Sequence, residues 1–196
     1  MIIPNAVYRR ELSGGTLTVT PTGGQHSLEA LFDIAERRNP KRAFLFVSKV
    51  LGRHIPIAPS VMRSAYRQLA LQIPSDLPEP VLFVGLAETA VGLGAGVYDE
   101  ALSRYKNSVY MTSTRHPVAG DLLCEFKENH SHATDHLLYH PADPVLRARV
   151  RDAKSLVLID DEATTGNTFI NLLEALRADA GLSQLERVVT GTLTDW

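Results

Sequence analysis

Stretches of continuous apolar residues alternate along the chain with stretches whose apolar residues recur at helical spacing, which predicts alternating strands and helices. Continuous apolar runs such as AFLFV are typical of strands buried on both faces of a sheet. Such runs predict strands at 43–47, 81–85, 108–113, 156–159 and 186–194. Apolar residues at helical spacing predict helices at 28–39, 61–73, 89–104, 144–152 and 167–179. Ser27 and Ser60 are the expected N-caps of the first two helices.

This alternation predicts an α/β fold with a mostly parallel sheet flanked by helices, a Rossmann-like core. VYRRELSGGTLTVT at 7–20 indicates a hairpin about a Ser-Gly-Gly turn. Residues 114–135 are polar and aperiodic, and we expect a long loop there. We expect one domain over 1–196, with about 1–40 and part of 41–60 forming a small hood over the site. The end at GTLTDW, directly after a predicted strand, suggests the N-terminal part of a longer polypeptide.

Composition narrows the class of protein. The chain has 196 residues, 44% of them hydrophobic and 21% charged, with a formal net charge of −2. This balance argues against a general nucleic-acid or anionic-membrane partner. No apolar run is long enough for a signal peptide or a membrane span. The single cysteine, Cys124, fits a reducing cytoplasm.

The most informative segment is LVLIDDEATTGNT at 156–168, where an apolar strand runs into two aspartates and a small, hydroxyl-rich turn. In parallel sheets ligands bind beyond the carboxyl ends of the strands. A helix N-terminus attracts anions there, and Gly166 allows close backbone approach. We call this turn the phosphate cradle: Ala163, Thr164, Thr165, Gly166, Asn167 and Thr168.

Asp160 and Asp161 stand beside the phosphate cradle, so the ligand should carry hydroxyls, with or without a metal, next to its phosphate. No lysine precedes the last threonine, which excludes a Walker loop. A strand that simply ends in an Asp N-cap is the plain alternative. The combined strand, acidic pair and turn favour a ligand site, and a sugar phosphate fits.

At these residues the sequence resembles the type I phosphoribosyltransferases. The resemblance implies binding of phosphoribosyl pyrophosphate, with the acidic pair against the ribose 2- and 3-hydroxyls and the turn on the 5-phosphate. It implies Mg held mainly by pyrophosphate and ribose oxygens, with Asp160 and Asp161 acting directly or through water. Glu162 departs from the apolar residue usual there. Thr164 argues against the hypoxanthine–guanine branch, which has aspartate, while the orotate branch carries threonine.

The family also has a short loop that touches the pyrophosphate, and residues 86–89 have the right form after strand 81–85. We call residues 86–89 the pyrophosphate loop, with Ala87, Glu88 and Thr89 as expected ligand contacts. The glycines that follow, at 92, 94 and 96, also fit a helix packed closely through them.

Residues 114–136 match the place of the family's mobile catalytic loop. Arg115 is a candidate pyrophosphate partner, although a solvated surface arginine is an equal reading. The candidate catalytic residues of this region are Arg115, Glu125, His130, His132 and His136. Zinc binding by the histidines is a weaker alternative, and His140 reads as an ordinary surface or hydrogen-bonding residue.

Lys49, Arg53 and His54 follow the predicted strand 43–47, so we expect them at the same sheet edge, contacting substrate. A solvated basic turn is the alternative.

The wider pattern, including GLAETAVGLGAGVY, TSTRHP and ENHSHATDH, resembles the divergent phosphoribosyltransferase group associated with bacterial tellurium-resistance-type operons. The resemblance implies a pentosyltransferase of nucleotide metabolism that uses phosphoribosyl pyrophosphate and Mg to form or cleave an N-ribosidic bond to an unidentified base. A non-catalytic sensor of phosphoribosyl pyrophosphate and a ribosyl hydrolase or phosphorylase are the alternatives. Expected partners are small molecules, without nucleic acid or membrane, and a homodimer is one possible assembly.

Overall fold

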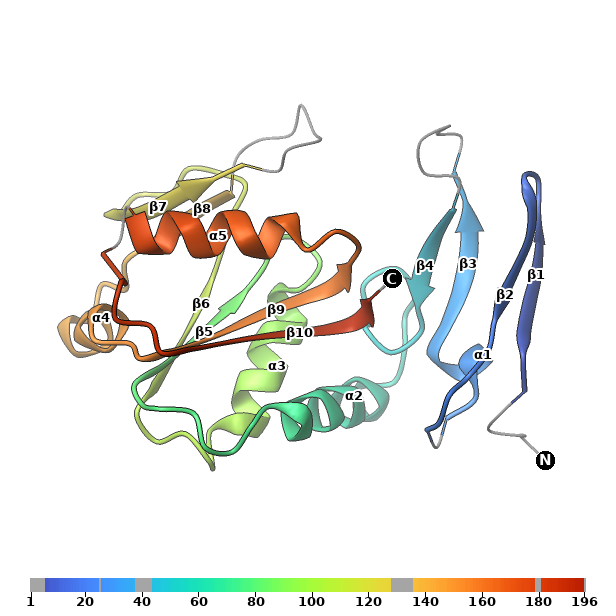
Figure 1. Cartoon of the computed structure of the whole chain (residues 1–196), viewed down its shortest axis with the longest axis horizontal. Coiled ribbons are helices and arrows are strands. Elements are labelled where there is room, and N and C mark those ends of the chain that lie inside the picture. The colour runs from blue at the N-terminus through green and yellow to red at the C-terminus, as the bar shows by residue number, and fades with distance from the viewer. Residues whose placement is uncertain (1–5, 25, 38–43, 128–135, 179–180, 196) are drawn as a thin grey trace. The chain divides into compact units, whose positions relative to one another are not determined.

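The computed structural model describes residues 6–24, 26–37, 44–127, 136–178 and 181–195. The chain divides into two compact units, Met1–Ala65 and Tyr66–Trp196. Each unit has its own sheets, which Figure 1 shows in blue to cyan for the first and in green to red for the second. Whether both belong to one functional domain, as the sequence suggested, stays a prediction.

The first unit contains two antiparallel strand pairs. Strands β1 (Tyr8–Leu12) and β2 (Gly15–Val19) form the predicted hairpin. Glycine suits its turn because Gly15 has a φ of 140°, a backbone conformation that other residues rarely adopt. The second pair joins β3 (Phe32–Glu36) to β4 (Phe44–Ser48).

The predicted helix at 28–39 is wrong beyond its first turn, because α1 covers Leu28–Leu31 alone and β3 follows directly. Ser27 occupies the N-cap position but its side chain makes no capping hydrogen bond, so the helix start is weakly stabilised. The alternation in FDIAE instead buries Ile34 and sets the Phe32 ring 5.0 Å from both the Tyr8 and the Phe46 rings. Cross-strand aromatic pairs of this kind stabilise a sheet.

Strand β4 was expected to be buried on both faces of the parallel sheet, and that expectation is wrong. All five of its residues are half-buried, and it pairs antiparallel with β3, with Phe46 opposite Ile34. Its apolar residues therefore form part of an aromatic cluster within the first unit. Helix α2 (Pro59–Gln72) starts in this unit with a proline, so Ser60 lies inside the helix and is not its cap.

The second unit is built on a four-stranded parallel sheet, as the sequence predicted. The strand order is β10 (Arg187–Asp195), β9 (Ser155–Ala163), β5 (Val81–Gly85), β6 (Ser108–Thr112). Every neighbouring pair is parallel. The fold class expected from the alternation of strands and helices is confirmed.

Successive residues of β5 and β9 point to opposite faces of this sheet, and each face has its own cover. On one face Leu82 and Leu158 belong to a core that includes residues of α5 (Asn167–Ala178). On the other, Phe83 contacts the Tyr98 ring of α3 (Val91–Ala101) at 5.2 Å. Helix α4 (Pro144–Arg151) precedes β9 and buries Val150 in the first of these cores.

Close packing through the glycines of α3 is confirmed for Gly94, against the sheet, and for Gly96, against α2, but Gly92 has open space where a Cβ would stand. A Cβ on Gly94 would come within 2.8 Å of the Gly85 Cα, and one on Gly96 would meet the Tyr66 ring. Close approach of α3 holds the start of that helix, and the pyrophosphate loop before it, against the end of β5.

The long loop predicted at 114–135 is only partly a loop. Strand β7 (Leu122–Phe126) lies inside it and pairs antiparallel with β8 (His136–Tyr139). Leu123, Cys124 and Phe126 are buried in the core. The burial of these three side chains outweighs the polar composition of the surrounding residues. Residues 128–135 lie outside the described residues. None of the described helices is both long and apolar enough to cross a membrane.

Candidate functional site

Three polar segments meet at the carboxyl ends of the parallel strands of the second unit. They follow β5, β6 and β9, and backbone hydrogen bonds tie them together. Leu86 N donates to Ile159 O at 2.9 Å, and Ser113 N donates to Gly85 O at 3.1 Å. The edge at which the sequence placed a ligand is therefore formed by all three segments.

The acidic pair lies on β9 itself, because the strand runs four residues beyond the predicted LVLI to Ala163. Asp160 and Asp161 are half-buried, and Asp160 lies opposite Thr192 of β10. Asp161 Oδ1 accepts a hydrogen bond of 2.6 Å from Thr89 Oγ1, and Asp161 N donates to Asp160 Oδ1 at 2.9 Å. The Thr89 bond joins the pyrophosphate loop to the acidic pair.

The phosphate cradle forms the turn between β9 and α5. Thr164 and Thr165 are exposed, and Gly166 has a φ of 71° with open space where a Cβ would stand. Helix α5 begins at Asn167, whose backbone N lies 3.4 Å from Thr165 Oγ1. Backbone N–H groups in the first turn of a helix have no intrahelical acceptor. The predicted strand–turn–helix arrangement is present, with donors available to an anion.

The pyrophosphate loop is held at both ends. At its start Ala87 N donates to Ser113 Oγ at 2.8 Å, and at its end Thr89 bonds Asp161. The peptide bond between Ala87 and Glu88 is cis. Glu88 itself is exposed, and its Oε1 lies 3.9 Å from His116 Nε2. Sequence reasoning missed His116 and Ser113, although both lie in TSTRHP directly after a predicted strand.

The candidate catalytic residues of 114–136 lie in different environments. Arg115 is half-buried beside the end of β6, and Glu125 is exposed on β7. His136 is buried, with 1% of its surface exposed, and its ring stacks on Phe126 at 4.6 Å. His130 and His132 lie outside the described residues.

Chemistry at the site allows a magnesium ion but offers no protein cage for one. Among the described residues, no three His, Cys, Asp or Glu side chains gather as a metal site would require. Two adjacent carboxylates do suit Mg²⁺, which is commonly bound by one or two carboxylates together with substrate phosphates and water. Asp160 and Asp161 therefore fit the ion that the resemblance implies, provided that a ligand supplies further oxygens.

The predicted substrate contacts Lys49, Arg53 and His54 belong to the first unit. The reason for placing them at the sheet edge is wrong, because β4 is not a strand of the parallel sheet. Lys49 Nζ donates to Glu29 O at 3.0 Å and lies 3.5 Å from Asp33 Oδ2, while Arg53 and His54 are exposed. Their contact with substrate stays a prediction.

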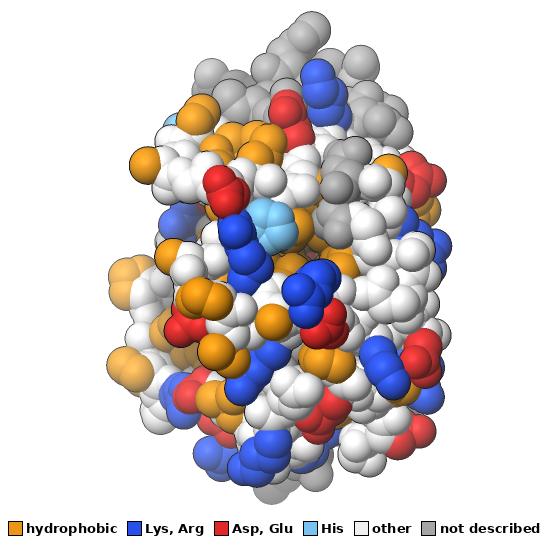
Figure 2. Space-filling model, turned by 90° about the vertical axis from the view of Figure 1, so that its left-hand side faces the viewer, with side chains coloured by type: hydrophobic (Ala, Val, Ile, Leu, Met, Phe, Trp, Pro, Cys, Tyr) orange, Lys and Arg blue, Asp and Glu red, His pale blue; other side chains and the backbone are white. Residues whose placement is uncertain are grey.

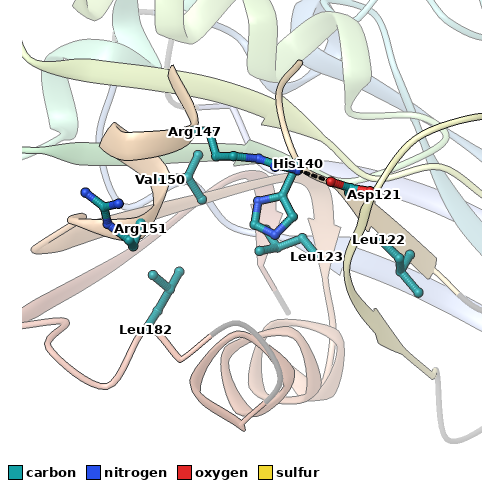
Figure 3. Close-up of a pocket in the computed structure, with 8 residues that line it drawn as sticks. All are labelled: Asp121, Leu122, Leu123, His140, Arg147, Val150, Arg151 and Leu182. Carbon is teal, nitrogen blue, oxygen red and sulfur yellow. Dashed lines mark hydrogen bonds and ion pairs between the residues drawn. The ribbon is translucent and has the colours of Figure 1, made fainter. Parts of the chain in front are cut away.

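A cavity of about 490 Å³ lies elsewhere in the second unit. It opens between α4, the start of β7 and the residue after β8, on the side that Figure 2 faces and Figure 3 enlarges. None of the predicted site residues lines it. The lining residues are Asp121, Leu122, Leu123, His140, Arg147, Val150, Arg151 and Leu182.

Two of the charged side chains that line this cavity, Asp121 and Arg147, pair with each other. Arg147 bonds Asp121, which lowers the pKa of that carboxyl. Burial, and then the Arg147 charge, lower the pKa of His140, against the opposing effect of Asp121. The neutral imidazole is therefore favoured at His140. Buried within the cavity wall, His140 Nδ1 and Arg147 Nε have no hydrogen-bond partner among the residues that the structure describes.

Comparison with known proteins identifies the family. The family model described as phosphoribosyl transferase matches residues 31–196. The chain therefore belongs to this family of enzymes, and the expected class, a phosphoribosyltransferase, is confirmed. No curated protein matches the sequence.

Solved structures show the same fold at low sequence identity. Adenine phosphoribosyltransferase from Saccharomyces cerevisiae has a TM-score of 0.55 and 13% identity, with 86% of each chain covered. The Giardia lamblia enzyme has a TM-score of 0.52 and 15% identity, covering 86% of this chain and 95% of its own. The enzyme from Trypanosoma brucei has a TM-score of 0.51 and 15% identity, covering 85% and 77%.

Proposed function

We propose that this protein binds 5-phosphoribosyl 1-pyrophosphate at the carboxyl edge of β5, β6 and β9. It transfers the 5-phosphoribosyl group between pyrophosphate and a nitrogenous base. The observation that carries the proposal is the hydrogen bond from Thr89 to Asp161. It places the pyrophosphate loop against the acidic pair, so that one ligand can contact the phosphate cradle, the acidic pair and the pyrophosphate loop together.

Each part of the site has a task in this reaction. Backbone N–H groups and hydroxyls of the phosphate cradle, Ala163 to Thr168, bind the 5-phosphate. Asp160 and Asp161 accept hydrogen bonds from the ribose hydroxyls. Their negative charge also favours the positive charge that develops on the ribose ring as the bond from C1 to pyrophosphate breaks. Ala87, Glu88 and Thr89 bind the pyrophosphate, with Arg115 as its cationic partner.

Magnesium, when bound, neutralises pyrophosphate charge, and Asp160 and Asp161 would hold it directly or through water together with ligand oxygens. Glu125, His130, His132 and His136 are candidates for proton transfer or substrate contact, and Lys49, Arg53 and His54 for recognition of the base. The hood over the site, a cytoplasmic location, a homodimer and the link to tellurium-resistance-type operons remain parts of the same hypothesis.

The relatives support the substrate class. The yeast structure was determined with an imino-altritol bisphosphate and adenine. The Trypanosoma brucei structure contains AMP, pyrophosphate and ribose 5-phosphate. We therefore expect a phosphorylated ribose and pyrophosphate here. The base stays open, because Thr164 argues against the hypoxanthine–guanine branch without selecting another base.

Calorimetry followed by product analysis tests the proposal. The protein should bind phosphoribosyl pyrophosphate in the presence of Mg²⁺. Isotope-labelled phosphoribosyl pyrophosphate and a library of bases should then yield a labelled nucleotide and pyrophosphate, detected by mass spectrometry. Absence of binding would refute the proposal. Binding without turnover of any base would favour the sensor, and ribosyl bond cleavage independent of pyrophosphate would favour the hydrolase or phosphorylase.

A further inference from the structure

A buried histidine is connected to the pyrophosphate loop through one serine. Ala87 N donates to Ser113 Oγ at 2.8 Å, and Ser113 Oγ lies 3.1 Å from His136 Nδ1. Ser113 is 2% exposed and His136 is 1% exposed. Neither side chain can reach a ligand directly without a change in the surrounding packing, so any effect on the ligand passes through Ala87.

The three groups Ala87 N–H, Ser113 O–H and His136 Nδ1 have one hydrogen-bonding arrangement that satisfies all of them. Ser113 Oγ accepts from Ala87 N–H, which leaves the serine hydroxyl hydrogen to be placed. No acceptor for it other than His136 Nδ1 is present among the described residues. If Nδ1 carried the proton instead, the Ser113 O–H would be a buried donor without an acceptor, which is unfavourable. Ser113 therefore donates to an unprotonated Nδ1.

We propose that His136 is a positioning residue that acts through Ser113 to orient the start of the pyrophosphate loop. The Thr89–Asp161 bond holds the other end of that loop, so Glu88, between them, is presented to the ligand by two fixed neighbours. This inference rests on the proposed function, because it assigns the pyrophosphate loop a ligand. It replaces direct catalysis by His136 with control of loop geometry.

The position of His136 is itself well defined. Its ring lies nearly parallel to that of Phe126, at an interplanar angle of 12°, and the two residues are paired across β7 and β8. The next residue, Leu137, exchanges two backbone hydrogen bonds with Thr114, which follows Ser113. Two strands and the end of a third thus hold the imidazole against the serine.

Orienting the loop before the ligand arrives lowers the cost of binding. A loop that must be ordered on binding loses conformational entropy, which reduces the affinity for the part of the ligand that it contacts. We therefore expect the Ala87–Ser113–His136 chain to contribute to the affinity for pyrophosphate groups. It should contribute little to the affinity for a phosphate in the phosphate cradle.

Three variants test the hydrogen-bonded chain from Ala87 through Ser113 to His136, and a fourth variant serves as a matched control. Ser113→Ala removes the hydroxyl that links Ala87 to His136. His136→Phe keeps a ring stacked on Phe126 but removes the hydrogen-bond acceptor. His136→Asn loses the ring but retains an acceptor in the place of Nδ1. Ser108→Ala is the control. Ser108 begins the same strand β6, is 1% exposed, and donates to Tyr105 O at 2.8 Å, far from the loop.

The measurements are calorimetric dissociation constants for phosphoribosyl pyrophosphate with Mg²⁺, and for ribose 5-phosphate, which lacks the pyrophosphate. Ser113→Ala and His136→Phe should weaken binding of phosphoribosyl pyrophosphate about tenfold, which corresponds to roughly 1.4 kcal/mol. Binding of ribose 5-phosphate should be unchanged. His136→Asn should restore most of the loss, and Ser108→Ala should match the wild type. Thermal unfolding by circular dichroism checks that each variant is folded.

Several outcomes would overturn the inference. Equal losses for the two ligands would mean that the variants disturb the fold rather than the loop. Better binding by His136→Phe than by His136→Asn would mean that packing on Phe126, not the acceptor, is what matters. Unchanged binding by Ser113→Ala would show that the hydroxyl of Ser113 does not link His136 to ligand binding. A wild-type protein that binds neither ligand would instead refute the proposed function.

Discussion

The second unit carries two regions with functional potential, and they differ in what they offer a ligand. The cavity beside α4 has an enclosed apolar floor, formed by Leu123, Val150 and Leu182. Its charged groups are mostly paired, as in Arg147 with Asp121. The phosphate cradle exposes Thr164 and Thr165, and it has a helix N-terminus, a glycine with positive φ and two carboxylates beside it.

We expect a helix N-terminus beside two carboxylates to indicate a site for a phosphorylated ligand better than cavity volume does. A polyanionic ligand needs donors and compensating charge, and these can be supplied by an exposed turn. A cavity with paired charges gives such a ligand less. The comparison predicts that substitutions at the phosphate cradle and acidic pair reduce ligand binding, while equivalent substitutions at the cavity do not.

The largest effect should follow from removing both charges of the acidic pair. Asp160→Asn with Asp161→Asn should lower the affinity for phosphoribosyl pyrophosphate with Mg²⁺ by about a hundredfold or more, roughly 2.7 kcal/mol. Asparagine can still accept the bond from Thr89, so the unit should stay folded. Calorimetry and circular dichroism measure the two quantities.

Asp121→Asn is the matched control for the acidic pair, since it removes one carboxylate charge from the cavity. It should leave that affinity within about twofold of the wild type, a difference of roughly 0.4 kcal/mol. Unchanged binding by the double variant of the acidic pair, or an equal loss in the control, would contradict the distinction between the two regions.

A smaller effect should follow from a change in the phosphate cradle. Gly166→Ala places a side chain at a φ of 71°, which costs about 1–2 kcal/mol of stability and displaces the neighbouring N–H groups. Binding of ribose 5-phosphate should weaken about tenfold. The measurement is again calorimetry, with thermal unfolding recorded in parallel.

Gly181→Ala is the control for Gly166→Ala, because it introduces the same backbone strain away from the phosphate cradle. Gly181 has a φ of 67° and, like Gly166, open space where a Cβ would stand. It should therefore lose similar stability without losing affinity. If both variants bound ribose 5-phosphate equally well, the turn at 163–168 would not be the phosphate site.

The smallest effect on binding, and a distinct effect on stability, should come from the cavity. Because burial in the folded protein lowers the pKa of His140 from the ordinary histidine value of about 6.5, the unfolded chain binds the proton more tightly. The resulting stabilisation is present above pH 6.5 and is lost as pH falls through that value towards the lower folded pKa.

Chemical denaturation of the wild type and of His140→Gln between pH 8 and pH 5 measures this contribution. The wild type should lose more stability than the variant on acidification, and both should bind phosphoribosyl pyrophosphate alike at pH 8. Parallel pH profiles would show that His140 is not held in its neutral form. Weaker ligand binding by His140→Gln would show that the cavity contributes to the site.

Much of the second unit could be predicted from local patterns. Strand β5 and the first half of β9 are apolar runs, and the segment 156–168 combines the end of such a run with two aspartates, hydroxyls, a glycine and the start of a helix within thirteen residues. Such signals depend on neighbours in sequence and survive without knowledge of the tertiary structure.

Elements whose state depends on distant partners were predicted less well. FDIAE has both helical and strand periodicity, and contacts of Phe32 with Tyr8 and Phe46 decided for the strand. LLCEF is a short apolar run in a polar region, and its burial under α5 and beside β8 made it β7. In both cases packing energy between segments far apart in the chain outweighed the local preference.

The sequence by itself determined which groups could bind a ligand: carboxylates, hydroxyls and a glycine turn at the end of a buried strand, which suit a phosphorylated sugar. Only the tertiary structure decided which groups lie close together. Thr89 meets Asp161 across 72 residues of chain, and Ser113 joins Ala87 to His136. A single serine or threonine has no signal in sequence for such a role, because its partner is selected by the parallel pairing that brings three strand ends to one edge.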